Sequence, residues 1–259
     1  MISLVDLVWC MLLLIGHRDL VVSGVAVNSA RQLLDKPDWL YTCKREMPNE
    51  NECFRKLFEG CFPALADGIP EVGIVSFEPL LIKSVELQKG SGNLVLSGGF
   101  HDLVVKGPSN ATVKKANLDL PNNNLTFDID LPLLRIKAKY NLKGNILLLP
   151  LVGSGDVNMA LKNVQTSVIT KISLRNEPEE TIHIDEMKVS FNVGGMRIHL
   201  TNLFNGNEIL GASINTFLNQ NSDEIIKELR PDLERGLSGT FKGLWNDVFS
   251  KIPTKLWLL

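Results

Sequence analysis

The sequence predicts an α+β protein of one domain, in which a long C-terminal helix is wrapped lengthwise by a single curved antiparallel sheet. Three observations lead to this prediction. Apolar residues recur with the helical period in residues 51–69, alternate with polar residues between about 72 and 203, and return to the helical period from 210 to 249. Helices do not alternate with strands, which disfavours a doubly wound α/β fold. With 44% hydrophobic and 22% charged residues, the composition is that of a globular protein.

The first 26 residues stand apart from this pattern. Leu4–Gly16 is an apolar run broken only by Asp6, and it is too short to cross a bilayer because a spanning helix needs roughly 20 apolar residues. Small residues follow at Ser23, Gly24 and Ala26. We therefore interpret residues 1–26 as a secretory signal peptide and residues 27–259 as the secreted, extracellular domain. The alternative is a buried helix at the N-terminus.

Three cysteines remain beyond that segment. Cys43 and Cys53 bracket a polar stretch that a disulfide can close, which in the chain-entropy picture adds about 2–3 kcal/mol of stability. Cys61 falls on the apolar face of a helix, where a cysteine is usually a small buried hydrophobe. Cys53 and Cys61 would lie about 12 Å apart on one helix, too far for a bridge. We predict a Cys43–Cys53 disulfide with Cys61 buried.

Residues 51–69 predict a short amphipathic helix that the disulfide ties down at its start. Pro63 is expected to bend or divide this helix, because proline lacks the backbone donor. Two sequons, at Asn110 and Asn124, lie beside turn-forming residues, where a glycan can be accommodated. We expect glycosylation there, in agreement with an extracellular route.

The central segment predicts the sheet. One face of residues 134–143 carries Leu134, Ile136, Ala138, Tyr140 and Leu142, and the other carries Arg135, Lys137, Lys139, Asn141 and Lys143. The same alternation buries Phe127 and Phe191, with a phase slip at Asp185-Glu186 that is typical of a β-bulge. Further strands are expected at 94–100, 103–106, 116–120, 157–161, 168–174 and 196–200. One wet and one dry face on nearly every strand indicates an antiparallel sheet.

A single helix of up to about 40 residues is predicted from Leu210 to Phe249, nearly 60 Å long if it is continuous. Asn207 is expected to cap its start, Pro231 to kink it and Pro253 to end it. Its apolar stripe includes Ile214, Phe217, Phe241 and Trp245. A helix this long cannot bury its stripe against a short partner, whereas one curved sheet along its length can.

Few residues point to catalysis. His183 and His199 fall on the outward phase of their strands, and His101 falls at an expected strand break. The sequence has no His-Glu-x-x-His or Cys-x-x-Cys spacing and no Gly-x-Ser-x-Gly nucleophile elbow. A net charge of −2 does not favour a nucleic-acid surface. We expect a protein that is not an enzyme and has no cofactor, metal or nucleic-acid partner.

The segment Gly144–Val157, GNILLLPLVGSGDV, begins like a phosphate-binding loop, because an apolar run leads into Gly153 and Gly155. It lacks the third glycine of a dinucleotide fingerprint and the Gly-Lys-Ser/Thr of a P-loop, and Asp156 would oppose phosphate. An alternating segment follows. We therefore predict that Leu149–Gly155 joins two strands, with the glycines supplying positive φ or a bulge.

The quantity of apolar surface is the stronger functional signal. A long helix inside a curved sheet is hard to fill from end to end, so we expect an elongated apolar tunnel for an apolar ligand. A close-packed core is the alternative. The residues expected to contact the ligand are Phe127, Ile136, Tyr140, Phe191, Ile214, Phe217, Phe241 and Trp245. Tyr140 is singled out because a buried phenol needs a partner, which can be a ligand oxygen, a backbone carbonyl or the tunnel mouth.

Taken together, these motifs resemble the insect takeout and juvenile-hormone-binding protein family over the mature length. Four blocks carry the resemblance: the spaced pair Cys43…Cys53, Gly68–Ile82 (GIPEVGIVSFEPLLI), Tyr140–Val157 (YNLKGNILLLPLVGSGDV) and Leu203–Pro253. The chain departs from the family in two places. No cysteine follows Cys61, whereas hormone-binding members of moths carry a second disulfide, and FEPL replaces the more usual Asp-Pro-Leu.

The resemblance implies a tubular lipid-binding fold and a secreted carrier of small hydrophobic molecules, such as a juvenile hormone-like terpenoid, a fatty acid or a related lipid. It also implies that Tyr140 can reach the ligand, and it links the family to circadian rhythm, feeding and chemosensation. We expect a monomer. One alternative is a lipid-transfer module that docks on a membrane through the tail Ile252–Leu259, with a tail folded back on the protein as the favoured arrangement. A hormone esterase is a more distant alternative.

Overall fold

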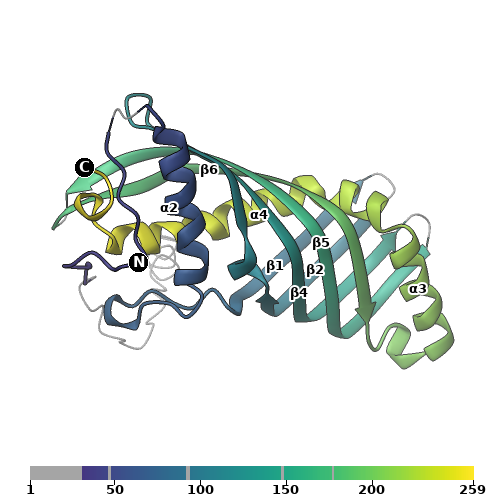
Figure 1. Ribbon diagram of the computed structural model, residues 1–259. Coiled ribbons are helices and arrows are strands. Elements are labelled where there is room, and N and C mark those ends of the chain that lie inside the picture. The colour runs from purple at the N-terminus through teal and green to yellow at the C-terminus, as the bar shows by residue number, and fades with distance from the viewer. Residues whose placement is uncertain (1–30, 46–47, 92–93, 147–148, 177) are drawn as a thin grey trace, which may run out of the picture. The chain divides into compact units, whose positions relative to one another are not determined.

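The computed structural model describes residues 31–45, 48–91, 94–146, 149–176 and 178–259. The predicted signal peptide therefore lies outside the described residues. The chain from Arg31 to Leu259 forms one compact unit, in which a curved sheet lies against a long C-terminal helix (Figure 1). The predicted α+β architecture is confirmed.

The sheet contains six antiparallel strands. They are β1 (Leu80–Ser91), β2 (Leu94–Lys106), β3 (Thr112–Asp119), β4 (Asn124–Ile146), β5 (Leu149–Asn176) and β6 (Glu180–Leu200). The strands are hydrogen-bonded in the order β1-β2-β4-β5-β6, and β3 pairs with the first part of β4, beside the stretch that pairs with β2. Three of these strands exceed 20 residues, so each runs along much of the C-terminal helix.

Several strands are longer than the alternation predicted. Segments that were expected to be separate strands are continuous in β2, β4, β5 and β6, and β1 is absent from the predicted set. The expected break at His101 is a register shift within β2, where Asp102 takes a φ of 51°. The expected bulge near Asp185 is confirmed, because Lys171 pairs with Glu186 while Ile172 pairs with Ile184.

The glycines of Leu149–Gly155 do not form a turn, and that prediction is wrong. Gly153 and Gly155 lie inside β5, paired with Leu142 and Tyr140 of β4, and neither has a positive φ. Because these glycines have no side chain, other groups of the protein can approach their backbone closely. A Cβ on Gly153 would stand 2.5 Å from Tyr140 Oη, and one on Gly155 would stand 2.8 Å from the Thr201 carbonyl oxygen.

The C-terminal helix is two helices, which corrects the prediction of one. They are α3 (Glu208–Gln220) and α4 (Ser222–Lys251), separated at Asn221. Asn221 leaves the helical conformation, and both its backbone N–H and its side-chain amide donate to the Phe217 carbonyl. Asn207 caps α3 by accepting from the Leu210 N–H, as predicted. Pro231 lies within α4, and α4 ends two residues before Pro253.

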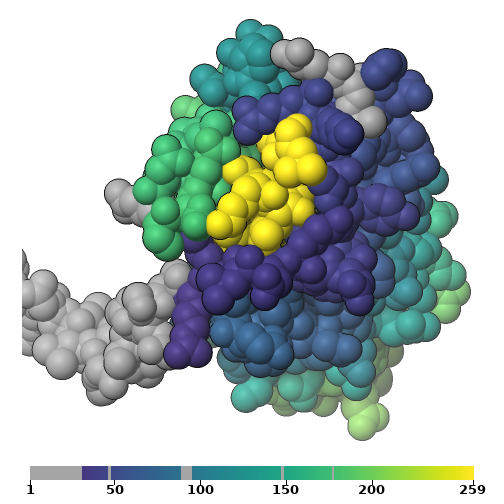
Figure 2. Space-filling model, turned by 60° about the vertical axis from the view of Figure 1, so that its left-hand side comes forward, coloured from purple at the N-terminus to yellow at the C-terminus, as the bar shows by residue number. Residues whose placement is uncertain are grey.

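The C-terminal tail packs back against the protein. Trp257 and Leu258 are buried, and the Cys43 N–H donates to the Trp257 carbonyl while the Leu259 N–H donates to the Cys43 carbonyl. Figure 2 shows this end of the chain set among the N-terminal residues of the described unit. This is the folded-back arrangement that the sequence favoured for the tail, with Leu259 at its end 62% exposed.

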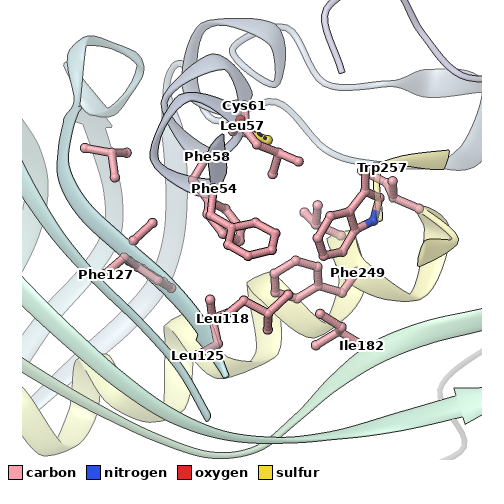
Figure 3. Close-up of a cluster of buried hydrophobic side chains, with 14 of the residues drawn as sticks. Phe54, Leu57, Phe58, Cys61, Leu118, Leu125, Phe127, Ile182, Phe249 and Trp257 are labelled. Atoms are coloured by element: carbon pink, nitrogen blue, oxygen red, sulfur yellow. Dashed lines mark hydrogen bonds between the residues drawn. The ribbon is translucent and has the colours of Figure 1, made fainter. Parts of the chain in front are cut away.

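Helix α2 (Glu50–Ala64) closes the same end of the sheet. Its buried face carries Phe54, Leu57, Phe58, Cys61 and Phe62. These side chains pack with Leu118, Leu125 and Phe127 of the sheet and Phe249 of α4 (Figure 3). Pro63 lies in the last turn, so it neither divides nor shortens the amphipathic face.

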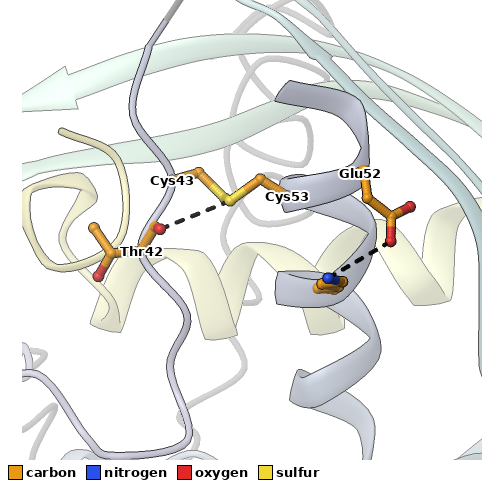
Figure 4. Close-up of a disulfide and its surroundings, with 5 residues drawn as sticks. Thr42, Cys43, Glu52 and Cys53 are labelled. Atoms are coloured by element: carbon orange, nitrogen blue, oxygen red, sulfur yellow. Dashed lines mark hydrogen bonds and ion pairs between the residues drawn. A yellow bond between two sulfur atoms is a disulfide. The ribbon is translucent and has the colours of Figure 1, made fainter. Parts of the chain in front are cut away.

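The predicted disulfide is confirmed. Cys43 and Cys53 are bonded with Cα atoms 5.8 Å apart, which links the first turn of α2 to the segment that pairs with the C-terminal tail (Figure 4). Cys61 is a buried free thiol whose S–H donates to the Leu57 carbonyl, and burial raises its pKa to about 12. The bridge and the tail thus hold α2 over the end of the sheet.

Candidate ligand-binding cavity

An apolar cavity of about 320 Å³ lies between the inner face of the sheet and α4. Its wall is built by cross-strand rows, because inward positions of neighbouring strands fall opposite one another. Ile136, Met159 and Ile198 form one such row across β4, β5 and β6. Phe127, Val168 and Val189 form another.

Helix α4 supplies the opposite wall. Its lining residues recur at helical spacing and are Ile225, Ile226, Leu229, Leu233, Leu237, Phe241, Leu244 and Trp245. Residues 225 to 245 span about 30 Å at 1.5 Å per residue. The wall of the cavity is therefore elongated along the helix, in agreement with the length of the three longest strands.

The end of the cavity near α2 is aromatic. The ring of Trp245 lies edge-on to Phe62, Phe77 and Phe127, and each pair of ring centroids is 6.1 Å apart. Edge-to-face contacts of this kind favour fixed ring orientations. The aromatic rings at this end of the cavity are therefore held in fixed orientations, whereas the remainder of the cavity is lined mainly by aliphatic side chains.

The lining carries no charge and little polarity. Apart from Thr166 and Trp245, its side chains have no N–H or O–H group. Thr166 occupies an inward position on β5, where it pairs with Ile129 and Phe191. Among the described residues, neither the Thr166 hydroxyl nor the Trp245 indole N–H has a hydrogen-bond partner. These two groups are the polar contacts that a ligand can find in this wall.

Five of the eight predicted contact residues line the cavity: Phe127, Ile136, Phe191, Phe241 and Trp245. Tyr140, Ile214 and Phe217 do not. Ile214 and Phe217 belong to α3, and they pack in the apolar cluster beyond the Asn221 interruption. Their placement follows from that interruption, which separates the α3 stripe from the α4 stripe that faces the cavity.

Tyr140 is held by the protein itself. Its hydroxyl donates to the Thr201 carbonyl at 2.5 Å, the side chain is 2% exposed, and burial raises its pKa to about 12. The hydroxyl lies over Gly153, where any side chain would collide with it. Of the alternatives that the sequence left open for the Tyr140 phenol, the structure shows the backbone carbonyl.

A row of polar side chains closes the seam between β6 and the helices. Asn246 makes two hydrogen bonds to Ile184, accepting from its N–H at 2.7 Å and donating to its carbonyl at 3.0 Å. Asn219 and Asn215 of α3 do the same at Ile198 and Leu200. In this way side chains satisfy edge-strand groups that would otherwise need another strand or water.

The rest of the seam follows α4 at intervals of four residues. The Val189 N–H donates to Ser238 Oγ and the Phe191 N–H donates to Glu234 Oε1, each at 3.0 Å. Lys242 Nζ donates to the Asp185 carbonyl. These residues were not predicted, because a polar stripe on an amphipathic helix is typical of a solvent-facing surface. The four-residue repeat of Glu234, Ser238, Lys242 and Asn246 was the available signal.

The titratable groups of the described chain lie away from the cavity. His101, His183 and His199 are all absent from its lining. His183 is half-buried rather than exposed as predicted, and burial lowers its pKa despite Asp185 at 4.0 Å. Within the described ranges, no group of three or more potential ligands is placed to hold a metal ion. No described helix combines the length and hydropathy needed to cross a bilayer.

Comparison with known proteins agrees with this arrangement. The family model for haemolymph juvenile hormone binding proteins (JHBP) matches residues 20–259. The chain belongs to the JHBP family. This family comprises binding proteins of the haemolymph that carry hydrophobic ligands. The resemblance seen in the sequence is thereby confirmed.

Individual relatives show the same likeness. The chain is 26% identical to the circadian clock-controlled protein daywake of Drosophila melanogaster and to that of Drosophila yakuba, over 84% of this chain and 86% of each relative. The crystal structure of Takeout 1 from Epiphyas postvittana matches with a TM-score of 0.72 and 25% identity, covering 81% of this chain and 96% of that one. This JHBP-family chain therefore has the tubular fold of Takeout 1.

Proposed function

We propose that this protein is a secreted, monomeric carrier that holds one small hydrophobic ligand in the cavity between the sheet and α4. The observation that carries the proposal is the cavity wall, which is uncharged and almost wholly apolar on both the sheet side and the helix side. Such a wall takes an apolar molecule out of water at about 25 cal/mol per Å² of buried area. A terpenoid, a fatty acid or a related lipid has the required chemistry.

The mechanism is sequestration without covalent chemistry. Among the described residues, the cavity lining contains no His, Asp, Glu, Lys, Cys or Tyr side chain that could act as a general base on a bound ligand. Thr166 and Trp245 are the groups that can orient a polar end of the ligand. The seam of side-chain hydrogen bonds along β6 and the covered tail keep the remaining wall closed to water.

The test is ligand binding with a cavity-blocking variant and a matched control. Ala138 is buried and lines the cavity, whereas Ala212 is exposed on α3. Ala138→Phe should weaken displacement of the fluorophore N-phenyl-1-naphthylamine by a C16 fatty acid at least about tenfold, and Ala212→Phe should leave it unchanged. Circular dichroism verifies folding, and Ala138→Leu replaces the first variant if that variant is unfolded.

Two results would contradict the proposal. Unchanged binding in folded Ala138→Phe or Ala138→Leu would place the ligand elsewhere. Native mass spectrometry of protein purified from its natural source should detect a bound lipid of stoichiometry one on a monomer, and an empty protein that binds no added lipid would exclude the carrier function. Turnover of a hormone ester would instead indicate an esterase.

A further inference from the structure

A second recess lies on the opposite face of the sheet from the cavity. This cleft, of about 810 Å³, is lined by residues of β4, β5 and β6 and by the last turns of α3. The polar residues that the strands contribute come from outward positions, whereas Ile136, Met159, Met196 and Ile198 border both the cleft and the cavity. The cleft residues Arg135, Asn158 and Arg197 directly neighbour the inward-facing Ile136, Met159 and Ile198. Because successive side chains of a strand point to opposite faces, the basic side chains of the cleft lie on the other side of the sheet from the cavity.

The cleft has cationic walls and a neutral floor. Register places Arg135, Ala160 and Arg197 in one cross-strand row. The next row contains Lys137, Asn158 and His199. The basic side chains of β4 and β6 thus stand on either side of β5, about 10 Å apart at two strand spacings. Acidic residues are absent from the lining.

The basic side chains of the cleft have no charged or hydrogen-bonding partner among the described residues. Within the described part of the chain, Arg135, Lys137, Arg197 and His199 form no ion pair and no side-chain hydrogen bond. Like charges gathered without partners repel one another, and an anion relieves that repulsion. The cluster is a local feature, because the whole chain carries a net charge of −2.

The cations continue in a line beyond the cleft. Lys139 and Lys143 follow Arg135 and Lys137 on the outward face of β4, at multiples of two residues. Two residues of a strand advance about 6.7 Å, so the line from Arg135 to Lys143 is about 27 Å long. Asp156, beside Lys139, is the acidic residue on this stretch of β5. A line of this length fits an extended chain of negative charges better than a single small anion.

We propose that this cleft and line bind a linear sulfated polysaccharide. Sulfate groups repeated along a chain match cations repeated along a strand, and Thr216 and Gln220 of α3 add hydrogen-bonding groups at one wall. A flat bilayer surface cannot enter a recess between a helix and a sheet. A single-stranded nucleic acid would call for aromatic side chains on which bases stack, and the lining has no Phe, Tyr or Trp.

Such binding would place the protein on a glycan surface without occupying the apolar cavity, because the basic side chains of the cleft are absent from the cavity lining. The proposal is therefore independent of the proposed carrier function, and either can fail alone. Ligand displacement by a fatty acid should be the same with and without bound polysaccharide.

The experiment measures binding to immobilised heparin by surface plasmon resonance. The variant Arg135→Glu/Lys137→Glu/Arg197→Glu removes the cleft cations, and Lys171→Glu/Arg175→Glu/Lys188→Glu makes the same charge change at exposed positions of β5 and β6 outside the cleft. We expect the cleft variant to bind heparin at least about tenfold more weakly and the control to stay within about twofold. Added NaCl should weaken wild-type binding.

Neutral and chain-length controls complete the test. Ala160→Trp blocks the floor without changing the charge, and it should also weaken binding. A heparin dodecasaccharide should bind at least about tenfold more tightly than a disaccharide, because only the longer chain spans the line of cations. Absence of wild-type binding, equal losses in the two triple variants, or equal affinity for the disaccharide would overturn the proposal. Equal affinity for a single-stranded oligonucleotide would overturn it as well.

Discussion

The Tyr140–Thr201 hydrogen bond allows a direct test of whether Tyr140 supports the fold or contacts the ligand. Tyr140→Phe removes only the hydroxyl, which donates to the Thr201 carbonyl at 2.5 Å from a side chain that is 2% exposed. Loss of a buried hydrogen bond should lower the free energy of unfolding by about 1–2 kcal/mol. For a chain of this size the melting temperature should fall by about 2–8 °C. Ligand affinity should stay within about twofold, because Tyr140 is absent from the cavity lining.

A substitution at Gly153 provides a second test of where the Tyr140 hydroxyl lies. A Cβ added there would stand 2.5 Å from Tyr140 Oη and 3.1 Å from Leu203 Cδ2, so Gly153→Ala should destabilise the protein by about 1–3 kcal/mol. Removing the hydroxyl makes room for that Cβ. In the double variant Tyr140→Phe/Gly153→Ala, the loss should therefore be smaller than the sum of the single losses by about 0.5–2 kcal/mol.

Urea denaturation followed by circular dichroism measures the cycle, and displacement of N-phenyl-1-naphthylamine measures ligand binding. Tyr41→Phe is the matched control, because the same hydroxyl is removed from a side chain that is 57% exposed, and its effect should be within about 0.5 kcal/mol. Additive losses would show that the hydroxyl does not lie against Gly153. A large loss of ligand affinity with unchanged stability would restore the ligand-contact role.

Three further predictions concern the seam, the disulfide and the buried phenol. Asn246→Ala removes both hydrogen bonds to Ile184, whose side chain is fully buried, and should lower the free energy of unfolding in urea by about 2–3 kcal/mol. Asn145→Ala, at an exposed position of β4, should change it very little. Cys43→Ser/Cys53→Ser should lower the free energy of unfolding by about 2–3 kcal/mol, and reduction of the wild type should reproduce that loss. In Tyr41→Phe, Tyr140 is the remaining tyrosine, and its ultraviolet absorption should report a pKa of about 12. Because that pKa is raised above the ordinary value of 10.0, the contribution of Tyr140 to stability should be complete below pH 10 and lost as the pH rises to about 12; a titration midpoint near 10 would contradict its burial.

The parts of the fold that follow from hydrophobic period alone were predictable. The alternation on β4 and β6 identifies the inward residues Phe127, Ile136 and Phe191, since a one-residue slip would have exposed all of them. The ends of the strands were harder to predict from the sequence, because bulges and register shifts interrupt the alternation without ending the strand. The register shift at His101 is such a case.

The partner of each polar group could not be predicted from the sequence. Tyr140 and Asn246 both needed hydrogen bonds, but their partners, Thr201 and Ile184, lie 61 and 62 residues away along the chain. The interruption of the C-terminal helix at Asn221 could not be predicted from the sequence for a related reason. The apolar stripes of α3 and α4 keep nearly the same helical phase, while the hydrogen bonds to Phe217 that end α3 depend on local backbone geometry.

The composition of the cavity wall also determines how a ligand is selected. Burying a hydroxyl or amide without a hydrogen bond costs roughly 2–7 kcal/mol, so each unpaired polar group on a ligand should reduce its affinity by more than a tenfold factor. Thr166 pairs with Ile129, two residues along β4 from the Phe127 ring that Trp245 contacts, so both polar groups lie toward the same end of the cavity. They can therefore offset that cost for one polar end of a ligand, because the described cavity wall offers no other N–H or O–H group. Selection should then rest on excluding polar molecules rather than on recognising a particular functional group. Among ligands of equal length, those with oxygens at both ends should bind more weakly than those with one polar end.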